Sequence, residues 1–382
     1  VRRALSALGQ VLQSRGEYVE AIAVQQELVG MASGGDSPEL AADMSALAST
    51  HFYAGQYDTA DSLNTLVLAM NRRLHGTRHP MVAEDLINLG ATQLERGDYA
   101  AAEAFDTPAA SDAVGDVIAD DAVEVVDISL PPHLQRAVAE AALAAGKHVM
   151  VQKPMATTLE DARAIVEAAE QSGMKLAVNQ NGRWDPAIRA CRTLIERGVF
   201  GHLVSASFEL RTRQPWQAFW EDADQYPRLM MLGMSIHHLD QFRFLFGDPV
   251  EITAVTSTYP GQPWAGDSIA LYALRYDAGL LAVGFDDGFP WTRDWTVDYR
   301  IEGLGAIARG DIGWPTGGFS TLEYTTSDRP DTWIRPALSR KWFPDAFAGT
   351  MGELFRSIET GQEPSISGRD NLHTLRLVEA AY

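Results

Sequence analysis

The sequence predicts a mixed fold in three parts: an α-helical solenoid of repeats at 1–105, a partial parallel α/β sheet at 106–182, and an α+β part with an open, mostly antiparallel sheet at 183–382. Three observations lead to this prediction. A Gly-polar-Tyr pattern recurs in the first part, short β-branched runs alternate with Ala-rich stretches in the second, and apolar and polar residues alternate in the third. Helical repeats, buried parallel strands and half-buried strands have these signatures.

The composition limits the function classes. A chain of 382 residues with 46% hydrophobic residues suits two or three domains with ordinary cores. The formal charge of −20 argues against nucleic-acid binding, which depends on cationic side chains at the phosphates. No apolar run approaches the ~20 residues of a membrane span. Because Cys191 is the single cysteine and no signal-peptide pattern follows Val1, we expect a cytoplasmic protein without an internal disulfide.

Internal repeats occupy the N-terminal part. Three triplets, Gly16-Glu17-Tyr18, Gly55-Gln56-Tyr57 and Gly97-Asp98-Tyr99, each follow an apolar helical stretch and precede an Ala-rich one. Pro38 and Pro80 stand where the next helix should begin, and proline is tolerated there because a first-turn N–H has no helical partner. The pattern predicts helix pairs joined by tight turns.

The segment LGATQLERGDYAAAEAF, Leu89 to Phe105, resembles tetratricopeptide repeats of the long kind found in kinesin light chains. The resemblance covers residues 1–105 and implies a curved solenoid whose concave face binds a peptide or protein. Helices that only pack against one another would give the same pattern, so both interpretations stay open.

Alternating strands and helices follow. The β-branched run Val123–Leu130, ended by Pro131-Pro132, predicts a buried parallel strand. A helix over Leu134–Ala145, stopped by Gly146, leads to a second strand at His148–Val151. Such alternation with short links predicts a parallel, doubly wound sheet.

The spacing of Thr157 and Glu160 is that of a capping box, which predicts the start of the next helix, and Gly173 should end it. Leu176–Asn179 is then the third parallel strand. Later segments with period-two stretches predict the strands of the antiparallel sheet: Leu203–Arg213, Glu251–Ser257, Ser268–Tyr276, Leu280–Phe285, Trp295–Glu302 and Gly305–Asp311.

Five ordered segments resemble landmarks of the Gfo/Idh/MocA oxidoreductases: VVDISLPPHL, AGKHVMVQKP, NQNGRWDPAIR, SIHHLDQFRFLFGDP and SIETGQEPSISGRDNLHTLRLVEAAY. The resemblance covers residues 106–382. It implies a Rossmann-like cofactor domain, an NAD or NADP cofactor, and a sugar or polyol substrate. It also implies a homo-oligomer that forms through the C-terminal sheet.

The glycine-rich turn of this family is missing. No G-x-G-x-x-G precedes Val123, since Gly34-Gly35 lies in a loop between repeats and Gly115 stands alone. This turn normally lets a helix N-terminus approach the dinucleotide pyrophosphate. We therefore expect weak cofactor binding. The chain also ends at Tyr382, inside the expected last helix, and it reads either as a natural fusion or as a chimera of two genes.

The resemblance implies catalytic roles for Lys153 and His237. Relatives carry Glu-Lys-Pro where this chain has Gln152-Lys153-Pro154, and their lysine acts on the substrate hydroxyl. A partly buried ammonium with a lowered pKa suits proton transfer. His237 is the histidine three residues before Asp240 that would face the substrate. Many polyol dehydrogenases of the family place an Asp one helical turn before it, where this chain has Gly233.

Further predictions about the site come partly from the resemblance and partly from the residues themselves. Asp240 should support its helix and His238 should be packed. We expect no metal site, because His237 and Asp240 lack a third ligand. Trp291, Arg293 and Trp295 are interpreted as core or interface. The cofactor-binding residues should be Ser129, Pro131, Pro132, Gln152 and Lys153, and the substrate-binding residues Asn181, Arg183 and His237.

Two hypotheses follow from the sequence. In the first, the chain is an NAD(P)-dependent dehydrogenase of a sugar, cyclitol or related secondary alcohol, impaired by the missing glycine-rich turn. In the second, it is a non-catalytic tetratricopeptide scaffold or peptide-binding protein fused to a dehydrogenase remnant. The missing turn is the feature that separates them.

Overall fold

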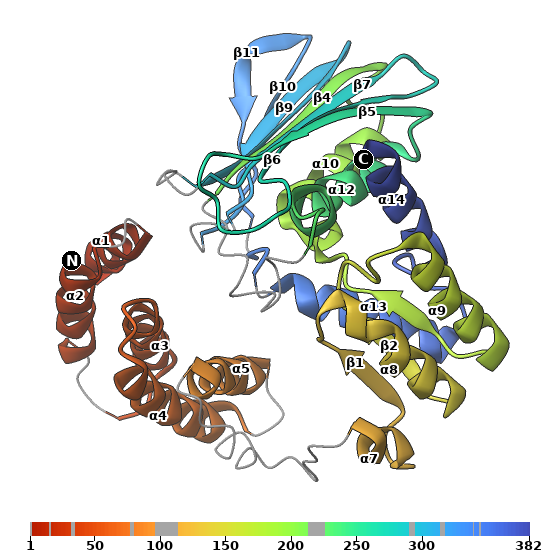
Figure 1. Ribbon diagram of the computed structural model, residues 1–382. Coiled ribbons are helices and arrows are strands. Elements are labelled where there is room, and N and C mark those ends of the chain that lie inside the picture. The colour runs from red at the N-terminus through yellow and green to blue at the C-terminus, as the bar shows by residue number, and fades with distance from the viewer. Residues whose placement is uncertain are drawn as a thin grey trace. The chain divides into compact units, whose positions relative to one another are not determined.

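The computed structural model describes residues 2–14, 17–31, 35–76, 80–95, 114–212, 226–289, 295–313, 318–338, 340–343 and 345–382. The chain divides into two compact units, Val1–Asp112 and Ala113–Tyr382 (Figure 1). The predicted junction at Phe105 lies outside the described residues. The predicted division of the second unit at residue 182 stays an interpretation. Within the described ranges, no helix has both the length and the apolar character needed to cross a membrane.

The described residues of the first unit are helical, as the repeats predict. Its helices are α1 (Arg2–Ser14), α2 (Tyr18–Gly30), α3 (Pro38–Tyr53), α4 (Tyr57–His75) and α5 (Pro80–Glu95), and each packs against the next. Ser37 caps α3 by accepting from the Leu40 amide over 3.1 Å, with Pro38 in the first turn as predicted. The third triplet, Gly97-Asp98-Tyr99, and Gly16 lie outside the described residues.

The smaller sheet of the second unit is parallel, with the order β1-β2-β3. Its strands are β1 (Val125–Ile128), β2 (His148–Val151) and β3 (Leu176–Val178), which confirms the three predicted positions. The helices α7 (Val114–Ala119), α8 (Pro132–Ala144) and α9 (Leu159–Ser172) accompany them. β1 pairs with β2 alone and therefore forms an edge of this described sheet.

One helix start differs from the prediction. Thr158, rather than Thr157, caps α9, and its hydroxyl accepts from the Asp161 amide over 3.1 Å. The predicted capping box with Glu160 is therefore wrong by one residue, because Thr158 adopts the extended cap conformation. Gly173 ends the helix as predicted, in the left-handed conformation with φ 72°.

The second sheet has eight strands in the order β11-β10-β9-β8-β4-β7-β6-β5. All neighbours are antiparallel except β4 and β7, which run parallel. The strands up to β9 lie where the sequence predicts them, whereas the last two are not predicted. The bounds are β4 (Leu203–Arg211), β5 (Glu251–Ser257), β6 (Ile269–Arg275), β7 (Leu281–Asp287), β8 (Thr296–Gly303), β9 (Ala306–Asp311), β10 (Glu323–Thr326) and β11 (Arg329–Ile334).

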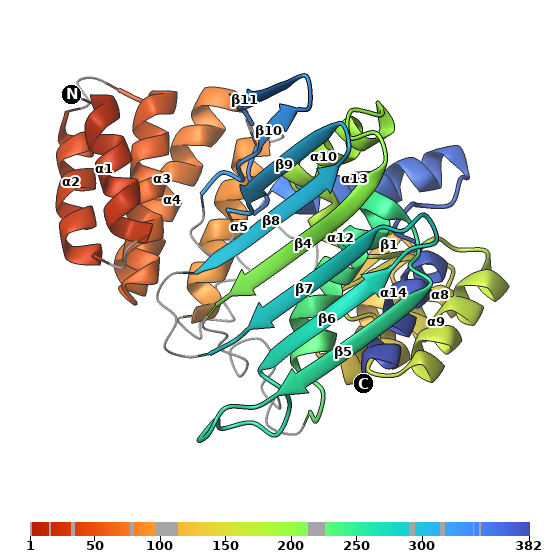
Figure 2. The same ribbon diagram turned by 90° about the horizontal axis from the view of Figure 1, so that it is seen from above.

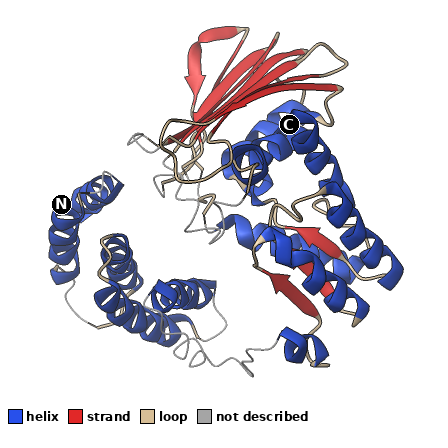
Figure 3. Cartoon of the chain, viewed as in Figure 1, coloured by secondary structure: helices blue, strands red, loops and turns tan. Residues whose placement is uncertain are grey.

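Helices cover one face of the large sheet within the second unit (Figures 2 and 3). A single hydrophobic core joins this face to the parallel sheet, so the two layers form one body. Tyr272 lies across Gly284 of the neighbouring strand, where a Cβ atom would stand 2.0 Å from the ring. The remaining helical elements are η1 (Asn181–Trp184), α10 (Pro186–Glu196), η3 (Met231–Ser235), α12 (Ile236–Phe246), α13 (Asp345–Thr360) and α14 (Gly368–Ala381).

The other face of the large sheet is open to solvent in the described part of the unit. It exposes a row of apolar side chains on β5, β6 and β7. Val255 is 67% exposed, Leu271 52%, Leu281 55% and Val283 44%. Of the predicted tryptophan cluster, Trp295 is described and is partly exposed, while Trp291 and Arg293 lie outside the described residues.

Candidate active site

The carboxyl ends of the parallel strands bring several predicted residues to one edge. In register, Ile128 pairs with Val151, and Val151 pairs with Val178. The residues that directly follow these strands therefore lie at the same edge, where ligands bind in doubly wound folds. They include Ser129, Gln152, Lys153, Asn179, Gln180 and Asn181.

Two hydrogen bonds fix Lys153 and the proline that follows it at this edge. Its Nζ atom donates to the carbonyl oxygen of Gly233 over 2.6 Å. The Lys153–Pro154 peptide is cis, and the Pro154 carbonyl accepts from the Gln135 side chain over 2.9 Å. Burial lowers the pKa of Lys153 to about 8, because a desolvated ammonium is disfavoured. A lysine in this range exchanges protons near neutral pH.

His237 is the second residue of α12 and lies close enough to Lys153 to feel its charge. It is 9% exposed, and its ring meets Trp342 edge-on at 5.8 Å between centroids. Burial lowers the pKa of His237 well below its usual value, and the positive charges of Lys153 and His238 lower it further. The imidazole is therefore neutral at pH 7, and its Nδ1 atom has no hydrogen-bond partner among the described residues. A neutral imidazole can accept or donate one hydrogen bond to a ligand.

More buried polar atoms near these groups lack partners in the described part of the chain. They are both amide atoms of Gln180, the Oδ1 atom of Asn181, the Oγ atom of Ser235 and the Oε1 atom of Gln241. Buried polar groups without partners are rare and call for an explanation, such as a ligand that supplies the missing bonds. Gln180 and Asn181 follow β3, and Ser235 lies in η3 immediately before α12.

The predicted cofactor-binding residues lie at the ends of β1 and β2. Ser129 is exposed and Gln152 is half-buried. The backbone N–H of Gln152 donates to the Ile128 carbonyl over 3.1 Å. Pro131 occupies the cap position of α8, and Pro132 begins the helix. The structure thus brings Ser129, Gln152 and Lys153 to the same edge of two adjacent strands.

Arg183 has a different setting from the one expected of a substrate ligand. Its guanidinium binds Asp240 through two bonds of 2.6 Å, Asp370 at 2.5 Å, and the Ser365 carbonyl at 2.7 Å. Burial alone would lower the pKa of Arg183, but the charges of Asp240 and Asp370 outweigh it and raise the pKa. Asp240 also accepts from the Thr374 hydroxyl over 2.9 Å. This network ties η1, α12 and α14 together, so Arg183 and Asp240 act as supports.

The side chain of His238, unlike that of His237, packs into the core between the helix and the large sheet. Its Nδ1 atom lies 2.8 Å from Asp286, and its ring stacks on Phe208 at 5.1 Å between centroids. The prediction that His238 is packed agrees with these contacts. Among the described residues, no group of three or more His, Cys, Asp or Glu side chains could hold a metal ion.

Three features of the site were not predicted from the sequence. The turn Met231–Ser235 is π-helical, a form that often marks functional positions. Trp342 reaches His237 from a distant segment, and Gln180 is buried without side-chain partners. A polar residue two positions after a buried strand, as Gln180 is, was the available signal. The π-helical turn and the Trp342 contact have no local signature.

Three family models match parts of this chain, and two of the matches overlap at residues 68–72. The NAD-binding Rossmann-fold model of the oxidoreductase family matches residues 68–180, the GFO/IDH/MocA C-terminal domain model matches residues 188–299, and a tetratricopeptide repeat model matches residues 1–72. The chain is 32% identical to a D-apiose dehydrogenase of Paraburkholderia graminis over 289 residues, which are 68% of this chain and 70% of that protein.

Two further relatives extend the comparison. The 1,5-anhydro-D-fructose reductase of Ensifer adhaerens is 31% identical over 76% of this chain and 86% of its own length. The structure of a levoglucosan dehydrogenase in complex with NADH and levoglucosan superposes with a TM-score of 0.63 over 74% of this chain and 83% of that chain, at 22% identity. The structural superposition shows that the two proteins share a fold. The sequence identities to the two curated relatives show that the chain belongs to the Gfo/Idh/MocA oxidoreductase family.

Proposed function

We propose that the chain is an NAD(P)-dependent oxidoreductase that acts on a secondary alcohol of a sugar, cyclitol or related polyol. The observation that supports this proposal best is the pairing of Lys153 with His237 at the carboxyl edge of the parallel sheet. His237 is buried and Lys153 is half-buried, and Lys153 lies close enough to lower the pKa of His237. The partnerless polar atoms of Gln180 and Asn181 lie at the same edge and offer hydrogen bonds to a polyhydroxylated ligand.

The residues at this edge fit the nicotinamide end of the cofactor. Ser129, Pro131, Pro132, Gln152 and Lys153 would hold it, and the nicotinamide would supply the hydride transfer. The affinity should be weak, because no G-x-G-x-x-G precedes Val123 to hold the pyrophosphate. Weak cofactor affinity does not by itself remove the catalytic step, because the side chains that move the proton belong to this chain.

In this proposal Lys153 and His237 act on the reacting hydroxyl. The Lys153 amine, in its neutral form, takes the hydroxyl proton during oxidation, and in the reverse direction the ammonium returns it. His237 holds the same oxygen through one ring nitrogen, because its neutral imidazole offers a donor and an acceptor. Asn181 contributes a side-chain oxygen to the neighbouring hydroxyls. Arg183 serves indirectly by holding Asp240 and therefore α12, which carries His237.

The test uses the full chain with NAD or NADP and the substrates named for its relatives: D-apiose, levoglucosan and 1,5-anhydro-D-fructose. Appearance or loss of reduced nicotinamide is followed by absorbance at saturating cofactor. We expect turnover with at least one compound, and loss of turnover in Lys153→Ala. Equal rates in the wild type and the variant would refute the assignment.

The repeat unit supports a second activity. We propose that α1 to α5 form a tetratricopeptide solenoid, because each helix packs against the next and the repeat model matches residues 1–72. Such solenoids bind peptides on a concave face. A peptide-library pull-down with the full chain tests this. A peptide that binds the chain, and no longer binds after substitutions in α1 to α5, would support the solenoid proposal.

The open face of the large sheet supports self-association. We propose that the apolar side chains of Val255, Leu271, Leu281 and Val283 pair with those of a second copy, because one monomer leaves them in water. A homo-oligomer through this sheet buries them.

A further inference from the structure

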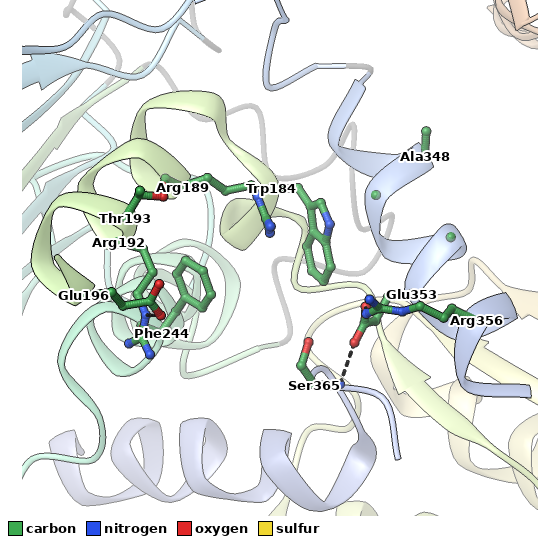
Figure 4. Close-up of a pocket in the computed structure, with 12 residues that line it drawn as sticks. Trp184, Arg189, Arg192, Thr193, Glu196, Phe244, Ala348, Glu353, Arg356 and Ser365 are labelled. Atoms are coloured by element: carbon green, nitrogen blue, oxygen red, sulfur yellow. Dashed lines mark hydrogen bonds and ion pairs between the residues drawn. The ribbon is translucent and has the colours of Figure 1, made fainter. Parts of the chain in front are cut away.

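A separate cavity of about 610 Å³ lies between α10, α12 and α13 (Figure 4). Its volume falls in the range of roughly 300–1,000 Å³ that small-molecule pockets occupy. None of the residues assigned to the candidate active site lines it. Neither the proposed oxidoreductase reaction nor the repeat unit uses this cavity. The kind of ligand that it binds is therefore inferred from the residues that line it.

The lining carries an excess of positive charge. Arg189 and Arg192 reach it from α10 and Arg356 from α13, against the carboxylates of Glu196 and Glu353. Arg192 pairs with Glu196 at 2.6 Å, and Arg356 pairs with Glu353. Among the described residues, Arg189 has no carboxylate within ion-pair distance. In a chain with a formal charge of −20, this local excess favours an anionic ligand.

Two aromatic rings border the same space. The guanidinium of Arg189 lies 6.0 Å from the Trp184 ring, and that of Arg192 lies 5.6 Å from the Phe244 ring. Figure 4 shows Trp184 on the side of α13 and Phe244 on the side of α10, with Arg189 between them. Aromatic faces next to guanidinium groups suit a planar ring that carries negative charge, because the ring stacks while the charge pairs.

Two glycines of α13 line the cavity and have different surroundings. A Cβ atom at Gly349 would stand 2.0 Å from Cδ1 of Trp184, so glycine lets the indole lie against the helix. At Gly352 a Cβ atom would meet nothing within 4 Å, so this position faces open space. Both glycines line the cavity. A larger residue at Gly352 would project into the volume without a clash at the backbone.

We propose that this cavity binds a small aromatic anion, a planar ring system of one or two rings that bears a carboxylate or a phosphate group. The ring lies against Trp184 and Phe244, and the anionic group pairs with Arg189. Arg192 and Arg356 are already paired with Glu196 and Glu353, which leaves Arg189 as the cation that selects the ligand.

Calorimetry on the full chain tests the proposal with 2-naphthoate and 2-naphthyl phosphate. Acetate and inorganic phosphate supply the charge without the ring, and 2-naphthol supplies the ring without the charge. We expect at least one ring-bearing anion to bind and the three controls not to bind at the same concentrations. The stronger of the two anions shows which anionic group the cavity prefers.

Three variants localise the binding. Arg189→Gln should weaken it about tenfold or more, because a charge-assisted bond is lost. Gly352→Leu should abolish it by filling the cavity. Arg197→Gln, at an exposed position beyond the end of α10, is the matched control and should bind as the wild type does.

Binding of 2-naphthol as tightly as the stronger of the two anions would overturn the proposal, as would the absence of binding by both anions or unchanged binding in Arg189→Gln. Circular dichroism checks that Gly352→Leu is folded, and the exposed Arg189→Gln variant decides the question if it is not. The titration needs neither cofactor nor turnover, so its outcome does not depend on the oxidoreductase proposal.

Discussion

The ammonium group of Lys153 donates to the carbonyl oxygen of Gly233 over 2.6 Å, within the π-helical turn that leads into His237. The resemblance to polyol dehydrogenases places a carboxylate at residue 233, and here a backbone dipole faces the lysine in its place. A dipole compensates a buried charge less than a carboxylate does, and burial is the cause of the lowered pKa of Lys153.

Replacement of Lys153 by alanine should lower kcat about a hundred- to ten-thousandfold, the usual contribution of a general acid–base group. The affinity for the cofactor should change little, because the lysine acts on charge that develops in the transition state. Steady-state kinetics gives kcat with whichever of D-apiose, levoglucosan and 1,5-anhydro-D-fructose is turned over. Calorimetry gives the Kd of the cofactor. Lys175→Ala, immediately before β3, is the control with normal turnover. A Lys153→Ala variant with near-normal kcat would exclude the catalytic role.

The pH profile of alcohol oxidation should show the lysine directly. Since the pKa of Lys153 is about 8, kcat/KM should rise with pH up to about 8, as the base loses its proton, and level off above it. His237 should not contribute a step near its usual pKa, because its pKa is lowered well below that value. The measurement is kcat/KM between pH 6 and 10. A profile that is flat across pH 8 would contradict the prediction.

The same lowered pKa links stability to pH. Lysine has a pKa of 10.5 in the unfolded chain and about 8 in the folded protein. Between these values the unfolded state binds more protons, so the free energy of unfolding should rise with pH in that window relative to Lys153→Met. Below pH 8 the difference between the two proteins should be constant. Urea unfolding of both at several pH values measures it, and a wild-type free energy of unfolding that falls relative to that of Lys153→Met between pH 8 and 10.5 would have the wrong sign.

The buried network around Arg183 should dominate local stability. Arg183→Met leaves the Asp240 carboxylate buried without its main partner, which should lower the free energy of unfolding by roughly 3–5 kcal/mol. Arg275→Met is the matched control, because its pair with Glu251 is exposed and should contribute about 0–1 kcal/mol. Chemical denaturation compares both variants. Equal losses would show that the buried network contributes no more than a surface pair.

The open sheet face should control the oligomeric state. Leu271→Lys places a charge in the middle of the apolar row, and a charge cannot be buried there without a partner. We expect the variant to be monomeric in light scattering at a concentration where the wild type is oligomeric. Leu134→Lys changes an equally exposed leucine on α8 and should leave the oligomer intact. Dissociation by both substitutions would point to a general loss of stability.

Local patterns predicted most of the elements. The strands β1 to β3 and the stop at Gly173 follow from short apolar runs and from the conformational freedom of glycine, which are signals of neighbouring residues. β10 and β11 were missed because their residues are mostly polar and partly exposed, so no apolar alternation marks them. The parallel pairing of β4 with β7 depends on which strands meet in space, which a local pattern does not contain.

For the candidate site, too, the sequence predicted single residues but not the contacts between them. Lys153 and His237 could be named because motifs carry them, whereas the setting of Arg183 depends on Asp240 and Asp370, which are distant in the sequence. The contact of Trp342 with His237 is of the same long-range kind. A single sequence shows which residues can form ion pairs but not which of them the fold brings together.

The π-helical turn at Met231–Ser235 sets the rotational phase of α12. Each residue of an α-helix turns the chain by about 100°. Deleting one residue would convert the turn to an α-helical one. The segment before the turn would then be rotated about the helix axis relative to α12, which follows it. The chain could then keep Leu229 bonded to Asp267, or keep His237 beside Lys153, but not both. The geometry of the site therefore depends on the number of residues in this turn as much as on their identity.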